Sequence, residues 1–362
     1  MPGVGAPASG GLGTPPTSSA GAPASSGGVP ATSAAAPAAS VATPGPAVPA
    51  ADPNRSPSDT VPASPIPRFT CSTATTQVST GEQLAAALAD AAPGQVIQLA
   101  DGTYPGEFTT TASGTAQQPI QLCGGRGAVI DGGSIKGGYA LHFDGAAHWR
   151  VNGFTVRNGQ KGVMVDTGTD IGLQDLLVED IGDEAVHLRK FSSRNVVRGL
   201  TIRRTGLRRD KFGEGVYVGS AQSNWATITG GAADGSNTNF VLDNTFSATA
   251  AESVDIKEGT IGGVVAGNTF DGSAMTGGDS WVDVKGNGWL ITDNTGRATT
   301  EDGFQTHVIV SGWGDHNVFT KNTAEMNGGQ GVGFYLHEAR SNRISCNNRV
   351  VGGALTNAKC SR

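Results

Sequence analysis

Residues 240–295 decide the fold, and they read FVLDNTFSATAAESVDIKEGTIGGVVAGNTFDGSAMTGGDSWVDVKGNGWLITDNT. Two kinds of short segment alternate in this stretch. One kind has apolar residues at its first and third positions, as in Val-Asp-Ile-Lys at 254–257 and Val-Asp-Val-Lys at 282–285. The other kind ends in an asparagine, and Asn244, Asn268, Asn294 and Asn322 follow one another at spacings of 24, 26 and 28 residues.

A repeat of this length, with two or three short strands in each unit, is typical of a stacked solenoid. The apolar-x-apolar-x segment recurs with first residues Leu141, Val163, Val186, Val216, Val254, Val282, Phe304 and Phe334. Leucine-rich repeats would need the LxxLxL spacing, and a β-propeller blade would be longer. The sequence therefore predicts an all-β protein, a right-handed parallel β-helix whose successive turns are linked by hydrogen bonds of their asparagine side chains.

The two ends of the chain differ from these repeats. Residues 1–66 consist almost wholly of Ala, Pro, Ser, Gly, Thr and Val, which predicts a disordered tail or linker ahead of a single β-helix domain at 67–362. The stretch GEQLAAALADAA at 81–92 precedes Pro93 and Gly94. We expect it to form a short helix that caps the first turn of the solenoid.

Composition and cysteine spacing restrict the class of protein. A net charge of −6 argues against a nucleic-acid partner, and without a run of 18 apolar residues we expect no membrane span. No CxxC pair is present, which argues against a zinc site. The cysteines fall as two outlying pairs, so we expect disulfides Cys71–Cys123 and Cys346–Cys360, with four buried free thiols as the alternative. Disulfides favour an oxidising compartment. We therefore expect a secreted monomer, although no signal peptide is recognisable at the N-terminus.

Alternation also predicts which side chains point away from the core. Stacked strands lie about 4.8 Å apart, so outward residues of successive turns should form columns. The first column is His142, Met164, His187, Tyr217, Asp255, Asp283, Gln305 and Tyr335. The second is Asp144, Asp166, Arg189, Gly219, Lys257, Lys285, His307 and His337. A third column precedes the strands, with Glu184, Glu214, Glu252, Ser280 and Asp302, and we expect Trp281 to point outward beside it.

This face can be a surface of simple ion pairs, or it can be a binding groove. Simple pairing explains Asp255 with Lys257 and Asp283 with Lys285, but not the imidazole, phenol and indole groups on the same stripe. Long glycine-rich insertions at 206–214, 221–238 and 271–280 favour a groove, because such loops usually wall the binding face of a solenoid.

Part of this stretch resembles a known family. The segment Glu252-Ser-Val-Asp-Ile-Lys257, the turn Asn268-Thr-Phe270 and the strand Val282-Asp-Val-Lys285-Gly-Asn287 resemble the parallel β-helix lyases of the alginate lyase and chondroitinase B type. The resemblance is close over residues 240–295 and extends to the rest only as fold. It implies a uronate β-elimination, with Lys257 at the position of the family's catalytic base and Glu252 at the position of one of its calcium-binding acids. Two positions depart from the family: Lys285 stands where it has an arginine, and Ala250 where it has a second calcium-binding acid.

We expect an acidic polysaccharide as substrate, with Lys257 and Lys285 as the catalytic residues. Glu214 or Asp255 could complete a calcium site with Glu252. Arg189 stays protonated and should bind carboxylate. The remaining predicted substrate contacts are His187, Tyr217, Asp255, Asp283, Trp281, His307 and His337. The effect of the neighbouring charges on the pKa of Lys257 is left open, because Lys285 lowers it and the aspartates raise it.

Three other functions compete with elimination. Asp255 and Asp283 on adjacent turns could form the close carboxylate pair of a retaining glycoside hydrolase, although a lysine beside each would keep both ionised. A C5-epimerase would share the abstraction of the C5 proton. A glycan-binding solenoid without catalysis would use the same groove and release no product.

Overall fold

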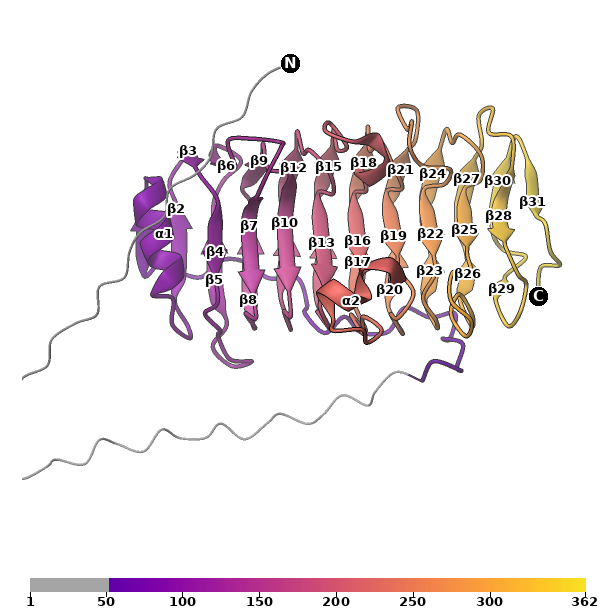
Figure 1. Ribbon diagram of the computed structural model, residues 1–362, viewed down its shortest axis with the longest axis horizontal. Helices are drawn as coiled ribbons and strands as arrows, with labels where there is room; N and C mark the ends of the chain where they lie inside the picture. Colours follow the sequence, from indigo (N-terminus) through magenta and orange to yellow (C-terminus); the bar gives the residue numbers. More distant parts are fainter. Residues whose placement is uncertain (1–51) are drawn as a thin grey trace, which may run out of the picture. The chain divides into compact units, whose positions relative to one another are not determined.

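The computed structural model describes residues 52–362, and nearly all regular structure in this range is β-strand. The strands stack in parallel into three sheets, and the chain visits each sheet once per turn, as in a parallel β-helix (Figure 1). The fold class expected from the sequence is confirmed. Within the described part of the chain, no helix is long and apolar enough to cross a membrane.

The first sheet has 11 strands and each of the others has 10. The strands of the first sheet are β1 (Thr76–Val78), β2 (Val96–Leu99), β5 (Ile120–Cys123), β8 (Trp149–Asn152), β11 (Gly172–Gln174), β14 (Val196–Arg198), β17 (Phe240–Leu242), β20 (Val264–Ala266), β23 (Leu290–Thr292), β26 (Val318–Thr320) and β29 (Arg343–Ile344). Those of the second sheet are β3 (Gly102–Pro105), β6 (Ala128–Asp131), β9 (Thr155–Arg157), β12 (Leu177–Glu179), β15 (Thr201–Arg203), β18 (Thr245–Ser247), β21 (Thr269–Asp271), β24 (Thr295–Arg297), β27 (Thr323–Glu325) and β30 (Arg349–Val351).

The third sheet carries the predicted charged columns. Its strands are β4 (Phe108–Thr110), β7 (Tyr139–Asp144), β10 (Lys161–Asp166), β13 (Val186–Arg189), β16 (Val216–Val218), β19 (Val254–Ile256), β22 (Val282–Val284), β25 (Phe304–Thr306), β28 (Val332–Leu336) and β31 (Ala354–Thr356). Four short helical segments interrupt the solenoid: α1 (Gly81–Ala89), the 3₁₀ turns η1 (Asp210–Phe212) and η2 (Gln222–Asn224), and α2 (Trp225–Ile228).

The core follows from the alternation. On β19 and β22, Val254 pairs with Val282 and Ile256 pairs with Val284, and all four side chains are fully buried. Apolar side chains at the same position of successive turns therefore stack inside the solenoid, and the intervening residues are turned outward. The sheet register fixes which outward side chains become neighbours.

Asparagines bind the turns together at the corner between the first and second sheets. Asn244 donates from Nδ2 to Oδ1 of Asn268 at 2.9 Å, and the same contact repeats from Asn268 to Asn294 and from Asn294 to Asn322. Each Oδ1 also accepts the backbone N–H of the preceding asparagine. The ladder continues one turn further than the four predicted positions, to Asn348.

Replacing one member of this ladder should weaken the solenoid. Asn294→Ala removes a buried amide that serves partners on both neighbouring turns, and each buried group left without a partner costs about 1–3 kcal/mol. We expect a clear fall in the denaturation midpoint, measured by urea unfolding. Asn224→Ala is the matched control, because Asn224 is exposed. Equal midpoints for the two variants would contradict the structural role of the ladder.

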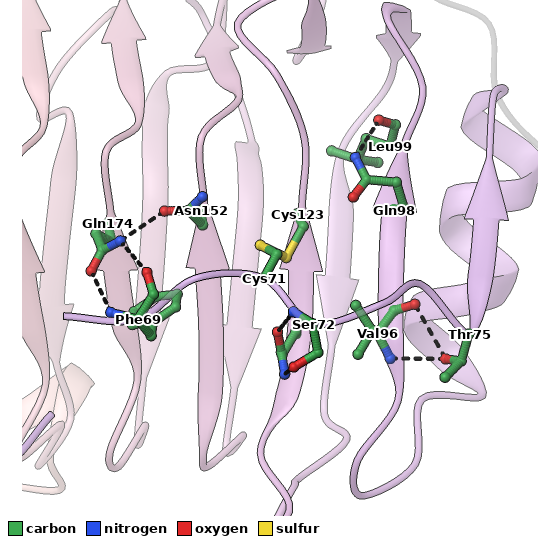
Figure 2. Close-up of a disulfide and its surroundings, with 11 residues drawn as sticks. Phe69, Cys71, Ser72, Thr75, Val96, Gln98, Leu99, Cys123, Asn152 and Gln174 are labelled. Carbon is green, nitrogen blue, oxygen red and sulfur yellow. Dashed lines mark hydrogen bonds between the residues drawn. A yellow bond between two sulfur atoms is a disulfide. The ribbon is translucent and has the colours of Figure 1, made fainter. Parts of the chain in front are cut away.

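The N-terminal end is closed as the sequence predicts. The helix α1 begins after Thr80, whose hydroxyl accepts the N–H of Gln83, and it packs Leu84 and Leu88 into the core. Both expected disulfides are present, Cys71–Cys123 near this end and Cys346–Cys360 near the other. Figure 2 shows the first of them joining the incoming chain to β5.

Residues 52–70 run along the outside of the first sheet as an extended strap (Figure 1). Ile66 is buried against outward apolar side chains of that sheet, and its carbonyl accepts Nη1 of Arg198 at 3.1 Å. Gln174 bonds both the N–H and the carbonyl of Phe69 (Figure 2). The expectation of disorder up to residue 66 is therefore wrong for 52–66, because the sheet offers these residues apolar surface and hydrogen bonds. The prediction for residues 1–51 lies outside the described residues.

Candidate active site

The candidate site lies on the outward side of the third sheet, which we call the site face. Register places the first predicted column in line: His187 pairs with Tyr217, Tyr217 with Asp255, and Asp255 with Asp283. The second column stacks just beyond the strand ends, where the backbone N–H of Lys257 bonds the carbonyl of Val218 one turn before it. Both columns predicted from alternation are present.

An ion-paired group, which we call the lysine–aspartate cluster, consists of one aspartate on each of β19 and β22, the lysine that follows each strand, and one histidine. Lys257 Nζ lies 2.6 Å from Oδ2 of Asp255. Lys285 Nζ bridges both carboxylates, at 2.7 Å from Asp255 and 2.6 Å from Asp283. His307 Nδ1 lies 2.9 Å from Asp283. Lys285 therefore pairs across the turns as well as within its own.

The cluster holds both lysines in the ammonium form. Burial alone would lower the pKa of Lys257, but the Asp255 carboxylate outweighs it and raises the pKa well above its ordinary value. The pKa of Lys285 is raised in the same way by Asp255 and Asp283. The sequence left open whether the neighbouring charges raise or lower the pKa of Lys257, and the aspartates raise it. The lysine side chains are only 14% and 11% exposed, so they face outward without being freely solvated.

Tyr217 adjoins the cluster on β16. Its ring centroid lies 4.9 Å from Nζ of Lys257 and 4.5 Å from the ring of His187. Burial, followed by the charge of Asp255, raises the pKa of Tyr217 well above its ordinary value, so the phenol keeps its proton. Burial lowers the pKa of His187, whose Nε2 lies 2.9 Å from the carbonyl of Gly219. The site face thus presents a protonated phenol next to an ammonium group.

Three carboxylates meet beside the cluster. Glu214, Glu252 and Asp255 each bring one oxygen to within 4.8 Å of the others. Oε2 of Glu214 is buried and has no hydrogen-bond partner. Burial and the charge of Asp255 raise the pKa of Glu252 to about 7, and burial with the charge of Glu184 raises that of Glu214 well above its usual range. Oxygen donors that repel one another in this way fit a hard divalent cation such as calcium.

Trp281 does not lie on the site face, contrary to the expectation. It is fully buried, packs on Phe304 at a centroid distance of 5.7 Å, and donates from Nε1 to the carbonyl of Ala298. The residue precedes β22, where the alternation no longer applies. Glycines leave the space for it, because a Cβ at Gly296 would come within 2.2 Å of the indole.

Two other predicted contacts flank the cluster along the site face. Arg189 is held by Asp166, with Nε at 2.6 Å from Oδ1, and it also reaches the hydroxyl of Tyr139. His337 stacks obliquely on His307 with ring centroids 5.4 Å apart. Arg189 and His337 therefore lie on opposite sides of the cluster, on turns before and after it.

Three residues near the site were not predicted from the sequence. Lys161, Arg209 and Phe212 line a cavity of about 150 Å³ together with Tyr217. A signal for Lys161 existed, because it precedes Val163 by the same two positions as Glu184 precedes Val186, and so extends the third column. Arg209 and Phe212 lie in an irregular insertion, where no periodicity applies.

Comparison with known proteins identifies the class of enzyme. The crystal structure of an alginate lyase from Paenibacillus sp. str. FPU-7 is 35% identical in sequence, with a TM-score of 0.73 over 78% of this chain and 98% of that one. Pectate lyase Pel9A is 17% identical, with a TM-score of 0.56 over 76% of this chain and 75% of that one. A GH136 lacto-N-biosidase from Eubacterium ramulus, 12% identical, has a TM-score of 0.50 over 78% and 63%. No family model and no curated protein matches the chain.

The chain belongs to the polysaccharide lyases that have a parallel β-helix fold, because the alginate lyase is both similar in sequence and matched over nearly its whole length. It is an enzyme that acts on polysaccharide. The two more distant structures share only the fold, and one of them is named for a hydrolase activity. The particular chemistry must therefore be argued from the site face.

Proposed function

We propose that this enzyme cleaves a polysaccharide of 4-linked uronates by β-elimination at the lysine–aspartate cluster. The observation that carries the proposal is the juxtaposition of Tyr217, Lys257 and Lys285 on adjacent turns of the site face. Alginate is the first substrate to test, given the sequence identity to an alginate lyase. We further propose that the enzyme is secreted as a monomer, in keeping with its two disulfides.

Elimination needs a group that neutralises the C6 carboxylate, a base for the C5 proton and an acid for the leaving O4. Lys285, cationic and ion-paired with Asp255 and Asp283, is the proposed binding group for the C6 carboxylate. Lys257 is the proposed base, and the pH dependence follows from its raised pKa. Below that pKa the neutral amine increases tenfold per pH unit, so kcat/KM should rise through the neutral and alkaline range.

Tyr217 is the proposed acid. Its raised pKa keeps the phenol protonated, and its ring lies against Lys257. A proton passed from the phenol to O4 can be restored from the ammonium of Lys257 after it has taken the C5 proton. A cycle that begins with Lys257 as the neutral amine would then end with a neutral amine and a protonated phenol, without a further proton donor.

Glu214, Glu252 and Asp255 are the proposed ligands of a calcium ion, since their carboxylate oxygens lie close together and Oε2 of Glu214 has no hydrogen-bond partner. A bound calcium ion would supply Lewis acidity toward the C6 carboxylate and offset the negative charge of Asp255. Ala250 still departs from the family pattern, and Glu214 from the preceding turn is proposed to take the place of the missing acid.

The cation site predicts a pH-dependent stability. Glu252 has a pKa of about 7 in the folded protein against an ordinary value of 4.5. The folded state therefore holds this proton more tightly, and the stabilisation is full below pH 4.5 and is lost as pH rises through 7. Calcium should raise the melting temperature at pH 8 more than at pH 5. In Glu252→Gln both the pH effect and the calcium effect should shrink, and an unchanged response would contradict the site.

A glycoside hydrolase remains a weaker candidate. Burial alone would raise the pKa of Asp283, but Lys285 and His307 outweigh it and hold the pKa below its ordinary value. Asp255 lies between two ammonium groups. A retaining hydrolase needs one carboxyl protonated at the start of the reaction, and the lowered pKa of Asp283 opposes this at that position.

A panel of uronate polymers tests the proposal. The enzyme should release ultraviolet-absorbing unsaturated uronides from at least one polymer. New reducing ends without that absorbance would indicate a hydrolase. Binding without either product would indicate a glycan-binding solenoid, and both results would overturn the proposal.

A further inference from the structure

The cavity lined by Lys161, Arg209, Phe212 and Tyr217 opens on the site face, one to three turns before the lysine–aspartate cluster. Its floor comes from β10, β13 and β16, with Lys161, His187 and Tyr217 among its lining residues. Two insertions wall it, one carrying Arg209 and Phe212 and the other carrying α2. Both insertions adjoin β16, so a single turn of the solenoid supplies the two walls. Tyr217 is common to this pocket and to the cluster.

Of the charged residues that line the pocket, three are cationic (Lys161, Arg189 and Arg209) and two are carboxylates (Asp183 and Glu184), although the whole chain has a net charge of −6. Ion-pair partners of these residues extend the group. Asp183 is shared by Arg208 and Arg209, and Asp166 is shared by Arg189 and Lys190. Glu184 pairs with Lys161, and the pKa of Glu184 is held well below its usual range. Five cations thus share three ionised carboxylates, because each aspartate has two cationic partners.

Arg209 is the member of this group with most freedom to bind a ligand. Its contact with Asp183 is long, at 3.3 Å, and its side chain is 49% exposed. The guanidinium lies 4.0 Å from the ring centroid of Phe212, which keeps it at the rim of the pocket. Arginine in this position can form paired hydrogen bonds to a carboxylate.

We propose that this pocket is a binding subsite for the carboxylate of a second uronate residue, with Arg209 as the residue that selects for its charge. The inference rests on the proposed function, because it assumes an acidic polysaccharide in the groove. A sugar bound here would position the adjoining glycosidic bond over Tyr217 and Lys257. The enzyme would then require at least two consecutive acidic residues.

The test measures binding without turnover. Calorimetry would give the Kd of an alginate tetrasaccharide, and of the same tetrasaccharide with its carboxylates reduced to alcohols, for the Lys257→Ala protein. Adding Arg209→Gln should raise the Kd of the charged probe by about tenfold, the loss expected for one charged hydrogen bond. The neutral probe should bind both proteins equally. Arg203→Gln is the matched control, because Arg203 is similarly exposed and ion-paired but lies on the second sheet.

An unchanged Kd for the charged probe in Arg209→Gln, or no binding of that probe to the parent, would overturn the subsite. Equal increases of this Kd in Arg209→Gln and Arg203→Gln would also overturn the subsite, since they would reflect long-range electrostatics and not a direct contact. The outcome is separate from that of the proposed function. Arg209-dependent binding, together with no unsaturated product from the enzyme that keeps Lys257, would refute elimination and leave the subsite standing.

Discussion

Lys257→Ala is expected to lower kcat/KM on uronate polymer by about a thousandfold or more. The variant lacks the proposed base for the C5 proton, and with it the ammonium group that would return a proton to Tyr217. The fold should survive. The Lys257 side chain contacts Asp255 and the ring of Tyr217 and lies outside the apolar core, and Asp255 keeps Lys285 as a partner. The measurement is the initial rate of unsaturated product formation. Lys321→Ala, in the turn after β26, is the matched control and should be fully active.

Lys257→Arg separates a base from a binding residue. Arginine keeps the positive charge and the pairing with Asp255, but it does not lose its proton at any working pH. If Lys257 is the base, Lys257→Arg should lower kcat/KM as much as Lys257→Ala does. If Lys257 only binds carboxylate, Lys257→Arg should remain active. An active Lys257→Arg enzyme would move the role of base to another group of the site face.

Lys285→Ala is expected to cost about 3 kcal/mol of folding free energy at neutral pH. The substitution removes the ammonium that bridges Asp255 and Asp283, both of which are buried, and an uncompensated buried charge is strongly destabilising. Lys257 and His307 remain as partners, which limits the loss to the lower part of the usual range. Chemical denaturation at pH 7 gives the measurement.

The pH dependence of this loss provides a check. Without Lys285 the folded pKa of Asp283 rises, so this part of the destabilisation is full above that pKa and shrinks as the carboxylate becomes protonated in acid. Lys285→Arg should restore most of the stability. It should also keep substantial activity if Lys285 binds the C6 carboxylate, since arginine does so too. A Lys285→Ala protein as stable as the parent at pH 7 would show that the bridge is not structural.

Much of this arrangement was predictable because a β-helix converts sequence period into spatial register. Once Val254 and Val282 are assigned to the core, Asp255 and Asp283 must be outward neighbours, and the structure pairs them. The same argument places Tyr217 before Asp255. Cysteine positions were sufficient for both disulfides, since each cysteine pairs with its nearest cysteine in the sequence, one pair toward each end of the solenoid.

What could not be predicted depends on contacts between turns and on irregular segments. Alternation cannot show that Lys285 reaches back to Asp255, because side-chain direction beyond the strand is not periodic. It fails for Trp281, which precedes its strand and fills space left by glycines on other turns. The strap at 52–70 has a disordered-type composition and is ordered by the sheet beneath it. Arg209 sits in an insertion without repeat, so only the folded chain brings it to the groove.

The central claim is elimination rather than hydrolysis, and isotope labelling of the solvent tests it most directly. The enzyme is incubated with alginate in water enriched in heavy oxygen, and the products are analysed by mass spectrometry. Elimination breaks the bond to O4 without adding water, so the account predicts that no label enters the products beyond the slow exchange seen in a no-enzyme control. One heavy oxygen per bond cleaved would contradict it and assign the groove to hydrolysis.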